Sequence, residues 1–498
     1  MHERYRIAAI TRIWSDVNKL KLWQLSELAV LQALVVLGQL SPADYETIER
    51  VLKANPPNIK WWKAKDAEIH HDLNAFLEER LRHMPKHLQL WFHRRMTSYD
   101  TEESTFVRML LQSVAVLDGR INKLMEVLKS KAHLFRFTPM MGDTHGQWAD
   151  VMTHGKRNAD WYCDLRSDVS MLDAAKGNLR FSKMSGFVGN NAGMDPQVEL
   201  IALERLGFKP YHGATQIMPR ELYVPLASSM VQMAKTLEKI ALTIRLGARS
   251  GTVIYQEPFG RKQKGSSAGP QKRNPIRNEK VSGLANMIEG YMGMIVRNCQ
   301  TWEERDIAQS CVERNAWPDI FHALIHAFDE MIRILSGLVV YPDNMLIEIV
   351  KTNGCYAASV AKEDLKEEGV RFGLEAEDCY RMVQLAAFNL GYKVDRGTIP
   401  TSYEQADTLL LVRQNRPLEP ALRGNIRDVI REGRLQVCEQ LDISRETIDR
   451  WNRILVEMFE SAEFNGKWNK TFSLSYLLRN EPAMFDGIFG EGWFEQAA

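Results

Sequence analysis

The stretch Leu226–Ile244, LASSMVQMAKTLEKIALTI, decides the fold class of this sequence. Its apolar residues recur at intervals of 4, 3, 4, 3 and 4 residues. The same spacing runs from Leu110 to Leu128 and, in a shorter form, from Leu324 to Leu338. This spacing places the apolar residues in one stripe along a helix, which we call a seam. A seam that continues for three turns or more is typical of long helices that pack nearly parallel. Because no comparable alternation of period two occurs in the sequence, we predict an all-α fold with a central long-helix bundle.

Turn-rich segments interrupt this helical pattern. The segments 185–196 and 257–275 are rich in glycine or proline and should not be helical. Tyr341-Pro342-Asp343 should end the third long helix. Because 498 residues exceed what one core usually supports, we predict three helical domains. These are residues 1–103, residues 104–344 with the bundle, and residues 345–498, a domain with a C-terminal extension whose aromatic tail should pack against another segment.

The composition excludes several classes of protein. Hydrophobic residues make up 45% and charged residues 26%, and the net charge is +1, so no global charge favours binding of nucleic acid or an anionic membrane. No run approaches the ~20 uninterrupted apolar residues of a membrane span, and the N-terminus lacks the pattern of a secretion signal. The six cysteines are scattered and none forms a CxxC pair. We therefore expect a cytoplasmic protein without a zinc site or disulfides.

A loop of mixed chemistry, GSSAGPQKRN (Gly265–Asn274), lies within a basic region. Seven cations and one acid, Glu279, occupy residues 260–280. Charge alone favours a solvated loop or a patch for polyanions. Glycine, serine, lysine and asparagine, however, are suited to a loop that closes over a ligand and holds a carboxylate.

Histidines and arginines mark three further candidate segments. His70 and His71 precede Asp72, and His145 and His154 flank a second segment. A lone histidine is more often structural than catalytic, and no HExxH or carboxylate–histidine spacing supports a metal site. In WEERDIAQSCVER (residues 302–314), the arginines form either a surface salt-bridge pattern or a clamp for phosphate.

The order of these segments carries more information than any one of them. GSSAGPQKRNPIRNE (residues 265–279) resembles the signature loop of the fumarase/aspartase superfamily, and more specifically that of the adenylosuccinate lyase family. Further motifs of this family occur in the same order over most of the chain before about residue 350. They are Arg4-Tyr5, Ser15-Asp16 with Trp23, His71-Asp72, His93 with Thr97-Ser98, the THG segment at His145, the TQ segment with Gln216, and Trp302–Arg314.

The resemblance implies a C–N lyase of purine biosynthesis. Such an enzyme removes fumarate from adenylosuccinate by anti elimination to give AMP, and it also converts SAICAR to AICAR. It needs no cofactor or metal, and three subunits of a homotetramer form each active site. By this resemblance the catalytic residues are Ser266 as base, His145 as acid, Glu279 as the partner of His145, His71 and Lys272. The implied substrate-binding residues are Arg4, Tyr5, His70, Asp72, His93, Thr97, Ser98, Gln216, Asn274, Arg305, Ser310 and Arg314, with the arginines clamping phosphate.

Some positions depart from the family pattern. Gly269 replaces the methionine of the loop, and Lys280 stands at a position that varies between branches. Other departures are Asp143, Trp148 and Asp150-Val151 around the THG motif, Arg94 and Arg95 before Thr97, and the longer C-terminal domain. They leave two alternatives: a related lyase for another succinylated amine, or a catalytically silent structural homologue. Retention of the implied catalytic residues argues against the silent homologue.

Overall fold

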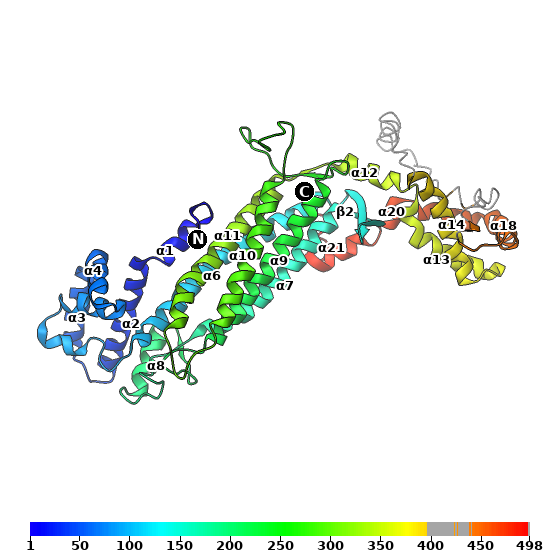
Figure 1. Ribbon diagram of the computed structural model, residues 1–498. Coiled ribbons are helices and arrows are strands. Elements are labelled where there is room, and N and C mark those ends of the chain that lie inside the picture. Colours follow the sequence, from blue (N-terminus) through cyan, green and yellow to red (C-terminus); the bar gives the residue numbers. More distant parts are fainter. Residues whose placement is uncertain (396–422, 424–425, 427–437, 440, 497–498) are drawn as a thin grey trace. The chain divides into compact units, whose positions relative to one another are not determined.

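The computed structural model describes residues 1–395, 423, 426, 438–439 and 441–496, and the side chains of residues 389–395 are not described. Within these residues the chain is mainly helical, and its few strands form two-stranded sheets (Figure 1). The predicted all-α class is therefore confirmed. No helix in the described ranges is both long enough and apolar enough to cross a membrane.

Contacts between residues divide the chain into two compact units. Unit 1 comprises Met1–Glu126, Asp164–Thr243 and Phe259–Gly337, and unit 2 comprises Val127–Cys163, Ile244–Pro258 and Leu338–Ala498. The predicted domain limits at 103/104 and 344/345 fall inside helices α6 (Ser98–Leu134) and α12 (Pro342–Lys351). The division into three domains stays a prediction.

Unit 1 contains most of the long bundle helices. Its helices include α1 (Ala8–Ile13), α2 (Asp16–Val36), α3 (Pro42–Ala54), α4 (Ile59–Ile69), α5 (Asp72–Leu81), α8 (Pro196–Arg205), α10 (Ile276–Arg297) and α11 (Ala308–Gly337), and the short η1 (Glu3–Tyr5), η2 (Lys86–Trp91), η3 (Gly177–Arg180) and η4 (Arg220–Tyr223). Strands β3 (Phe181–Ser182) and β4 (Lys209–Pro210) pair in parallel. The residues of α6, α7 (His154–Lys176) and α9 (Val224–Gly247) are divided between the units.

The predicted seams are the buried faces of the long helices. The seam residues of α6, from Leu110 to Leu128, and those of α9, from Leu226 to Ile244, are at most 3% exposed. Phe328 and Met331 of α11 are fully buried as well. The seams are therefore the faces on which the long helices pack, which confirms the predicted bundle. Each Å² of apolar area that they remove from water stabilises the fold by roughly 25 cal/mol.

The predicted breaks are largely confirmed. Residues 257–275 contain no helix, and residues 185–195 form the loop that ends where Pro196 begins α8. The end of the third long helix was predicted too late, because α11 ends at Gly337. Beyond it, β6 (Val339–Val340) pairs with β5 (Tyr255–Gln256), and Pro342 starts α12.

Unit 2 combines a hairpin with short helices. Strands β1 (Pro139–Thr144) and β2 (Gln147–Thr153) pair antiparallel, with a register shift between Met141 and Asp143. A core that includes Leu365, Trp451 and Trp468 holds the C-terminal helices together. These are η5 (Cys355–Ala357), α13 (Ala358–Gly369), η6 (Val370–Phe372), α14 (Ala376–Asp395), α18 (Arg445–Glu460), α19 (Ala462–Thr471) and α20 (Leu474–Leu477). The last helix, α21 (Glu481–Phe489), belongs to a separate cluster with Ala132 and Ala159.

Candidate active site

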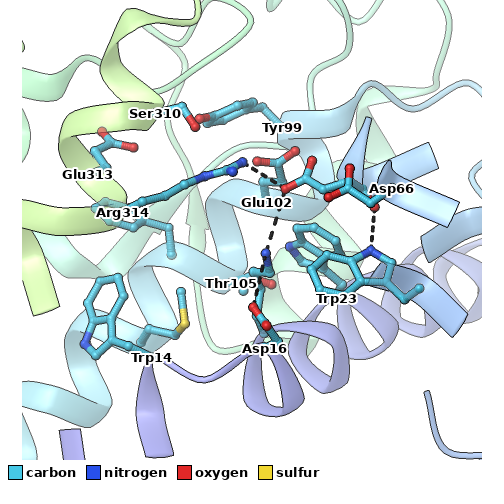
Figure 2. Close-up of a pocket in the computed structure, with 15 residues that line it drawn as sticks. Trp14, Asp16, Trp23, Asp66, Tyr99, Glu102, Thr105, Ser310, Glu313 and Arg314 are labelled. Carbon is cyan, nitrogen blue, oxygen red and sulfur yellow. Dashed lines mark hydrogen bonds and ion pairs between the residues drawn. The ribbon is translucent and has the colours of Figure 1, made fainter. Parts of the chain in front are cut away.

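Two adjoining cavities in unit 1 bring together many of the predicted site residues. Their volumes are about 440 and about 320 Å³, and both are lined by Asp66, Asp72, Glu102, Ser310 and Arg314. The smaller cavity is shown in Figure 2. The predicted residues that line the larger cavity are His70, His71, Asp72, Ser98, Gln216, Arg305, Ser310 and Arg314.

A sharp corner between α4 and α5 places the first histidines. His70 ends α4 in the left-handed conformation, with φ of 53°, and its backbone N–H donates to the Asp66 carbonyl at 2.7 Å. His71 then caps α5, because its Nδ1 accepts the backbone N–H of Asn74 at 3.3 Å. With Nδ1 as acceptor, the ring proton of neutral His71 lies on Nε2.

Asp72 is the centre of an ion-pair network in the shared wall. Arg314 Nη2 lies 2.8 Å from its Oδ2, and Lys19 Nζ lies 3.8 Å from the same oxygen. Lys19 is held between the rings of Trp23 and Trp62, at 4.9 and 4.7 Å from their centroids. Burial lowers the pKa of Lys19. Arg314 is still 59% exposed, so its guanidinium can reach an anion in the cavity.

Three of the predicted motifs are joined by hydrogen bonds. Gln216 Nε2 donates to Thr97 Oγ1 at 3.2 Å, and Arg305 Nη1 donates to Gln216 Oε1 at 3.2 Å. The Arg305 guanidinium also lies over the Tyr99 ring, 4.3 Å from its centroid. These contacts orient Arg305 beside the same cavity as Ser310 and Arg314.

Among the acids that the sequence did not single out are Glu102, which lines both cavities, and Glu313, which lines the smaller one. Burial and then the charge of Asp72 raise the pKa of Glu102 to about 8. Burial likewise raises the pKa of Glu313 to about 7, against the opposing charge of Arg220. Helical spacing could have found both acids, because Glu102 lies four residues after Ser98 and Glu313 three after Ser310.

His93 is bound by a buried acid and is not among the residues that line the two cavities. Its Nδ1 lies 2.7 Å from Glu27 Oε1, and its backbone N–H donates to Glu27 Oε2 at 3.1 Å. Burial opposes the charged imidazole, but the charge and hydrogen bond of Glu27 raise the pKa of His93 overall. The predicted substrate contact of His93 stays a prediction.

The signature loop folds back on itself around Ser266. Ser266 Oγ accepts the backbone N–H groups of Ala268 at 3.3 Å and Gly269 at 3.1 Å. A Cβ atom at Gly265 would lie only 2.0 Å from the Lys272 carbonyl oxygen, so the close approach of the two loop ends requires glycine. Lys272 and Glu279 are exposed, and Asn274 is half-buried.

The loop and the arginine cavity lie at opposite ends of α11. Arg277 and Lys280, at the start of α10, bind Glu330 at 2.7 and 3.2 Å. Tyr5 packs at the same end, with its ring 5.4 Å from His326, and Arg4 beside it is exposed. Glu330 lies 20 residues beyond Ser310, which corresponds to about 30 Å of helix. One chain therefore does not bring Ser266, Arg4 and Tyr5 to Arg314.

His145 lies in unit 2, at the tip of the β1–β2 hairpin. It is exposed, and both His145 and Gly146 have positive φ, 55° and 73°. This geometry is typical of a tight two-residue hairpin turn, so the imidazole is presented to solvent. His154 is buried and lies 3.1 Å from the Tyr255 hydroxyl, and burial lowers its pKa to about 3. His154 is thus a neutral core histidine.

The described side chains do not form a recognisable metal centre, since no group of three or more His, Cys, Asp or Glu residues among them could hold a metal ion. Two of the departures noted in the sequence, Arg94 and Trp148, are not among the residues that line the two cavities. Arg94 stacks on Trp91 at 4.4 Å, and Trp148 is 43% exposed on the hairpin.

Comparison with known proteins identifies the family. Residues 6–290 match the family described as lyase. The adenylosuccinate lyase of Synechocystis sp. is 32% identical over 78% of this chain and 88% of its own length. That of Aquifex aeolicus is 33% identical over 78% of this chain and 87% of its own length.

Solved structures show the same fold. The fumarate lyase from Mesorhizobium sp. BNC1 superposes with a TM-score of 0.75 at 16% identity, covering 99% of this chain and all of its own. The β-carboxy-cis,cis-muconate cycloisomerase of Acinetobacter calcoaceticus gives 0.72 at 18% identity, covering 98% of each chain. The chain therefore belongs to the lyase family of the fumarase/aspartase superfamily, and the two relatives that are 32% and 33% identical to it are adenylosuccinate lyases.

Proposed function

We propose that the protein is a C–N lyase that releases fumarate from adenylosuccinate to give AMP. The observation that carries this proposal is the larger cavity, where Arg305, Ser310 and Arg314 converge beside His71 and Gln216. Two guanidinium groups and a hydroxyl suit a phosphate, and the amide and imidazole suit the polar succinyl part. The names of the two relatives supply the substrate.

The elimination requires one base, one acid and donors for the developing charge. In the proposed reaction Ser266 removes the proton beside a substrate carboxylate, the C–N bond breaks with its electron pair passing to nitrogen, and His145 protonates that nitrogen. A serine is a weak base unless its alkoxide is stabilised. The two backbone N–H groups that donate to Ser266 Oγ provide such stabilisation. Lys272 and Asn274 would hold the substrate carboxylate, and Glu279 would keep His145 protonated.

The separation along α11 supports an active site built from several copies of the chain. The loop at one end cannot act on a substrate that Arg314 clamps at the other end, because Arg314 and Glu330 are 16 residues, or about 24 Å of helix, apart. The cavity wall also contains the acids Asp66 and Asp72, so an anionic substrate requires additional cations. The basic signature loop of a second copy would supply them, and a third copy would supply His145. In a homotetramer with closed symmetry, every site can receive residues from three copies of the chain in the same way.

Three finer properties belong to the same proposal. The enzyme would also cleave SAICAR to AICAR, since both substrates share the succinyl group on nitrogen. It would work without a cofactor and without nucleic acid or membrane partners. We place it in the cytoplasm, because its six cysteines form no disulfide.

A second candidate is cleavage of another succinylated amine. Glu102 favours it, because a carboxyl beside the phosphate clamp could accept a hydrogen bond from an N–H group of a different amine half. The test is to give the purified protein adenylosuccinate and to measure fumarate and AMP. We expect equal amounts of both products. No turnover of adenylosuccinate, together with fumarate release from another succinyl amine, would refute the first proposal in favour of the second.

A further inference from the structure

The C-terminal tail of unit 2, residues 481–496, packs on the corner where α6 ends and α7 begins. Phe485, Trp493 and Phe494 of the tail are at most 6% exposed and form one cluster with Ala132 and Ala159. The Trp493 ring stacks on Phe485 at 5.5 Å, and it also stacks on Phe489 at 4.3 Å. This cluster confirms that the aromatic tail packs against another segment, as the sequence predicted.

The end of the tail also binds the segment that leads into the hairpin. The Gln496 carbonyl lies 2.9 Å from His133 Nε2 and accepts a hydrogen bond from Arg136 Nη2 at 3.3 Å. The Arg136 guanidinium lies over the Phe137 ring at 4.6 Å. These contacts fix the path of the chain just before β1 begins at Pro139.

On the other side of the hairpin, one residue of the tail binds the end of β2. Both carboxylate oxygens of Glu481, the first residue of α21, accept hydrogen bonds from Thr153. The backbone N–H donates at 3.0 Å and the hydroxyl at 2.5 Å. Thr153 Oγ1 in turn accepts the backbone N–H of Lys156 at 3.0 Å, so Thr153 also caps α7. Figure 1 shows α21 beside β2.

The hairpin packs on the core of the C-terminal helices through Met141 and Val151, and the contacts of the tail add to this packing at its two ends. An isolated two-stranded hairpin is marginally stable in water. His145 lies eight residues from Thr153, which corresponds to about 25 Å of strand. A rotation of roughly 5° at Thr153 would move the tip by about 2 Å, and a misplacement of about 1 Å can lower a rate about 10²-fold.

We propose that Glu481 is a positioning residue that holds the β1–β2 hairpin, and with it His145, in its working orientation. The inference rests on the proposed role of His145. It assigns a function to the tail: residues 481–496 clamp both ends of the hairpin, with Gln496 at the entry and Glu481 at the exit. A second contact supports the exit, where Ser359 donates to Asp150 of β2 at 2.8 Å.

The test compares Glu481→Ala with a matched control. Asp364→Ala removes another carboxylate of unit 2 that binds a threonine, Thr471, away from the hairpin. We expect Glu481→Ala to lower kcat about 10²-fold with little change in KM, and Glu481→Gln to recover part of the loss, because the amide still accepts the Thr153 hydroxyl. Asp364→Ala should leave kcat unchanged.

Two measurements separate positioning from general damage. In the His145→Ala background, Glu481→Ala should cause no further loss of kcat, because the group that it positions is absent. Amide hydrogen exchange of residues 139–153 should become faster in Glu481→Ala and not in Asp364→Ala. An unchanged exchange rate, or an equal loss of kcat with and without His145, would overturn the inference. If His145→Ala alone keeps full activity, the proposed role of His145 fails, and hydrogen exchange still decides whether Glu481 holds the hairpin.

Discussion

Replacement of Glu102 by glutamine should remove a pH dependence from ligand binding at the arginine cavity. The carboxyl lies in the shared cavity wall, where the charges of Asp72, Arg305, Arg314 and Lys19 act on it. An ionised Glu102 would compete with a phosphate for the two arginines, whereas the neutral acid would not. Because burial raises the pKa of Glu102 to about 8, the neutral form predominates below that pH and is lost above it.

The size of the effect follows from this pKa. About nine-tenths of Glu102 is neutral at pH 7 and about one-tenth at pH 9, so affinity that requires the neutral form falls about tenfold over that range. AMP is a suitable probe, because the second pKa of a phosphate monoester is about 6 and its charge is constant above pH 7. In Glu102→Gln, binding of AMP should be nearly independent of pH between 7 and 9.

The assay is calorimetric titration of the whole enzyme with AMP at pH 7, 8 and 9 and at constant ionic strength. Asp66→Asn is the matched control, since Asp66 lines the same wall. This variant should keep the tenfold fall in AMP affinity between pH 7 and pH 9. The reasoning is refuted if Glu102→Gln retains the tenfold loss of affinity, or if the wild-type affinity does not change with pH.

The remaining predictions concern the loop and the clamp. Ser266→Ala and His145→Ala should each lower turnover by roughly 10²–10⁴-fold with the helical circular dichroism unchanged; near-normal rates in either variant would contradict the assignment. Arg314→Ala should mainly weaken binding of the phosphate-bearing substrate, seen as a rise in KM, and unchanged affinity would exclude the clamp. Gly265→Ala should lower turnover without unfolding the protein, because the new Cβ would meet the Lys272 carbonyl at 2.0 Å; wild-type turnover would show that the loop closes in another way.

Much of the fold could be predicted because its cause is periodic. Seam residues such as Leu117 and Leu237 are fully buried, as their spacing required. The loop at 257–275 was predictable from its prolines, glycines and cations. The hairpin around His145 was missed, because Met140 and Met141 are both buried and β1 therefore lacks a clear alternation of apolar and polar residues.

The candidate site was predictable only as a set of motifs. The motifs single out Gln216, Arg305 and Arg314, but the sequence contains no information on the distances between their side chains. Lys19 and Trp23 are four residues apart on α2, but the sequence could not show that Lys19 also contacts Trp62, because Trp62 belongs to α4. Helix length explains why the loop and the arginines lie apart, because 20 residues of α11 separate Ser310 in the cavity from Glu330 beside the loop.

The central claim is that the loop of one copy acts on a substrate clamped by another. The direct measurement mixes Ser266→Ala chains with Arg314→Ala chains, dissociates and reassembles them, and follows fumarate release. With shared sites, about a quarter of the sites in a random one-to-one mixture contain neither substitution, so activity should return to about that fraction of wild type. If mixed oligomers form and activity does not rise above that of either parent, each chain would use its own loop and clamp, and the claim would be wrong.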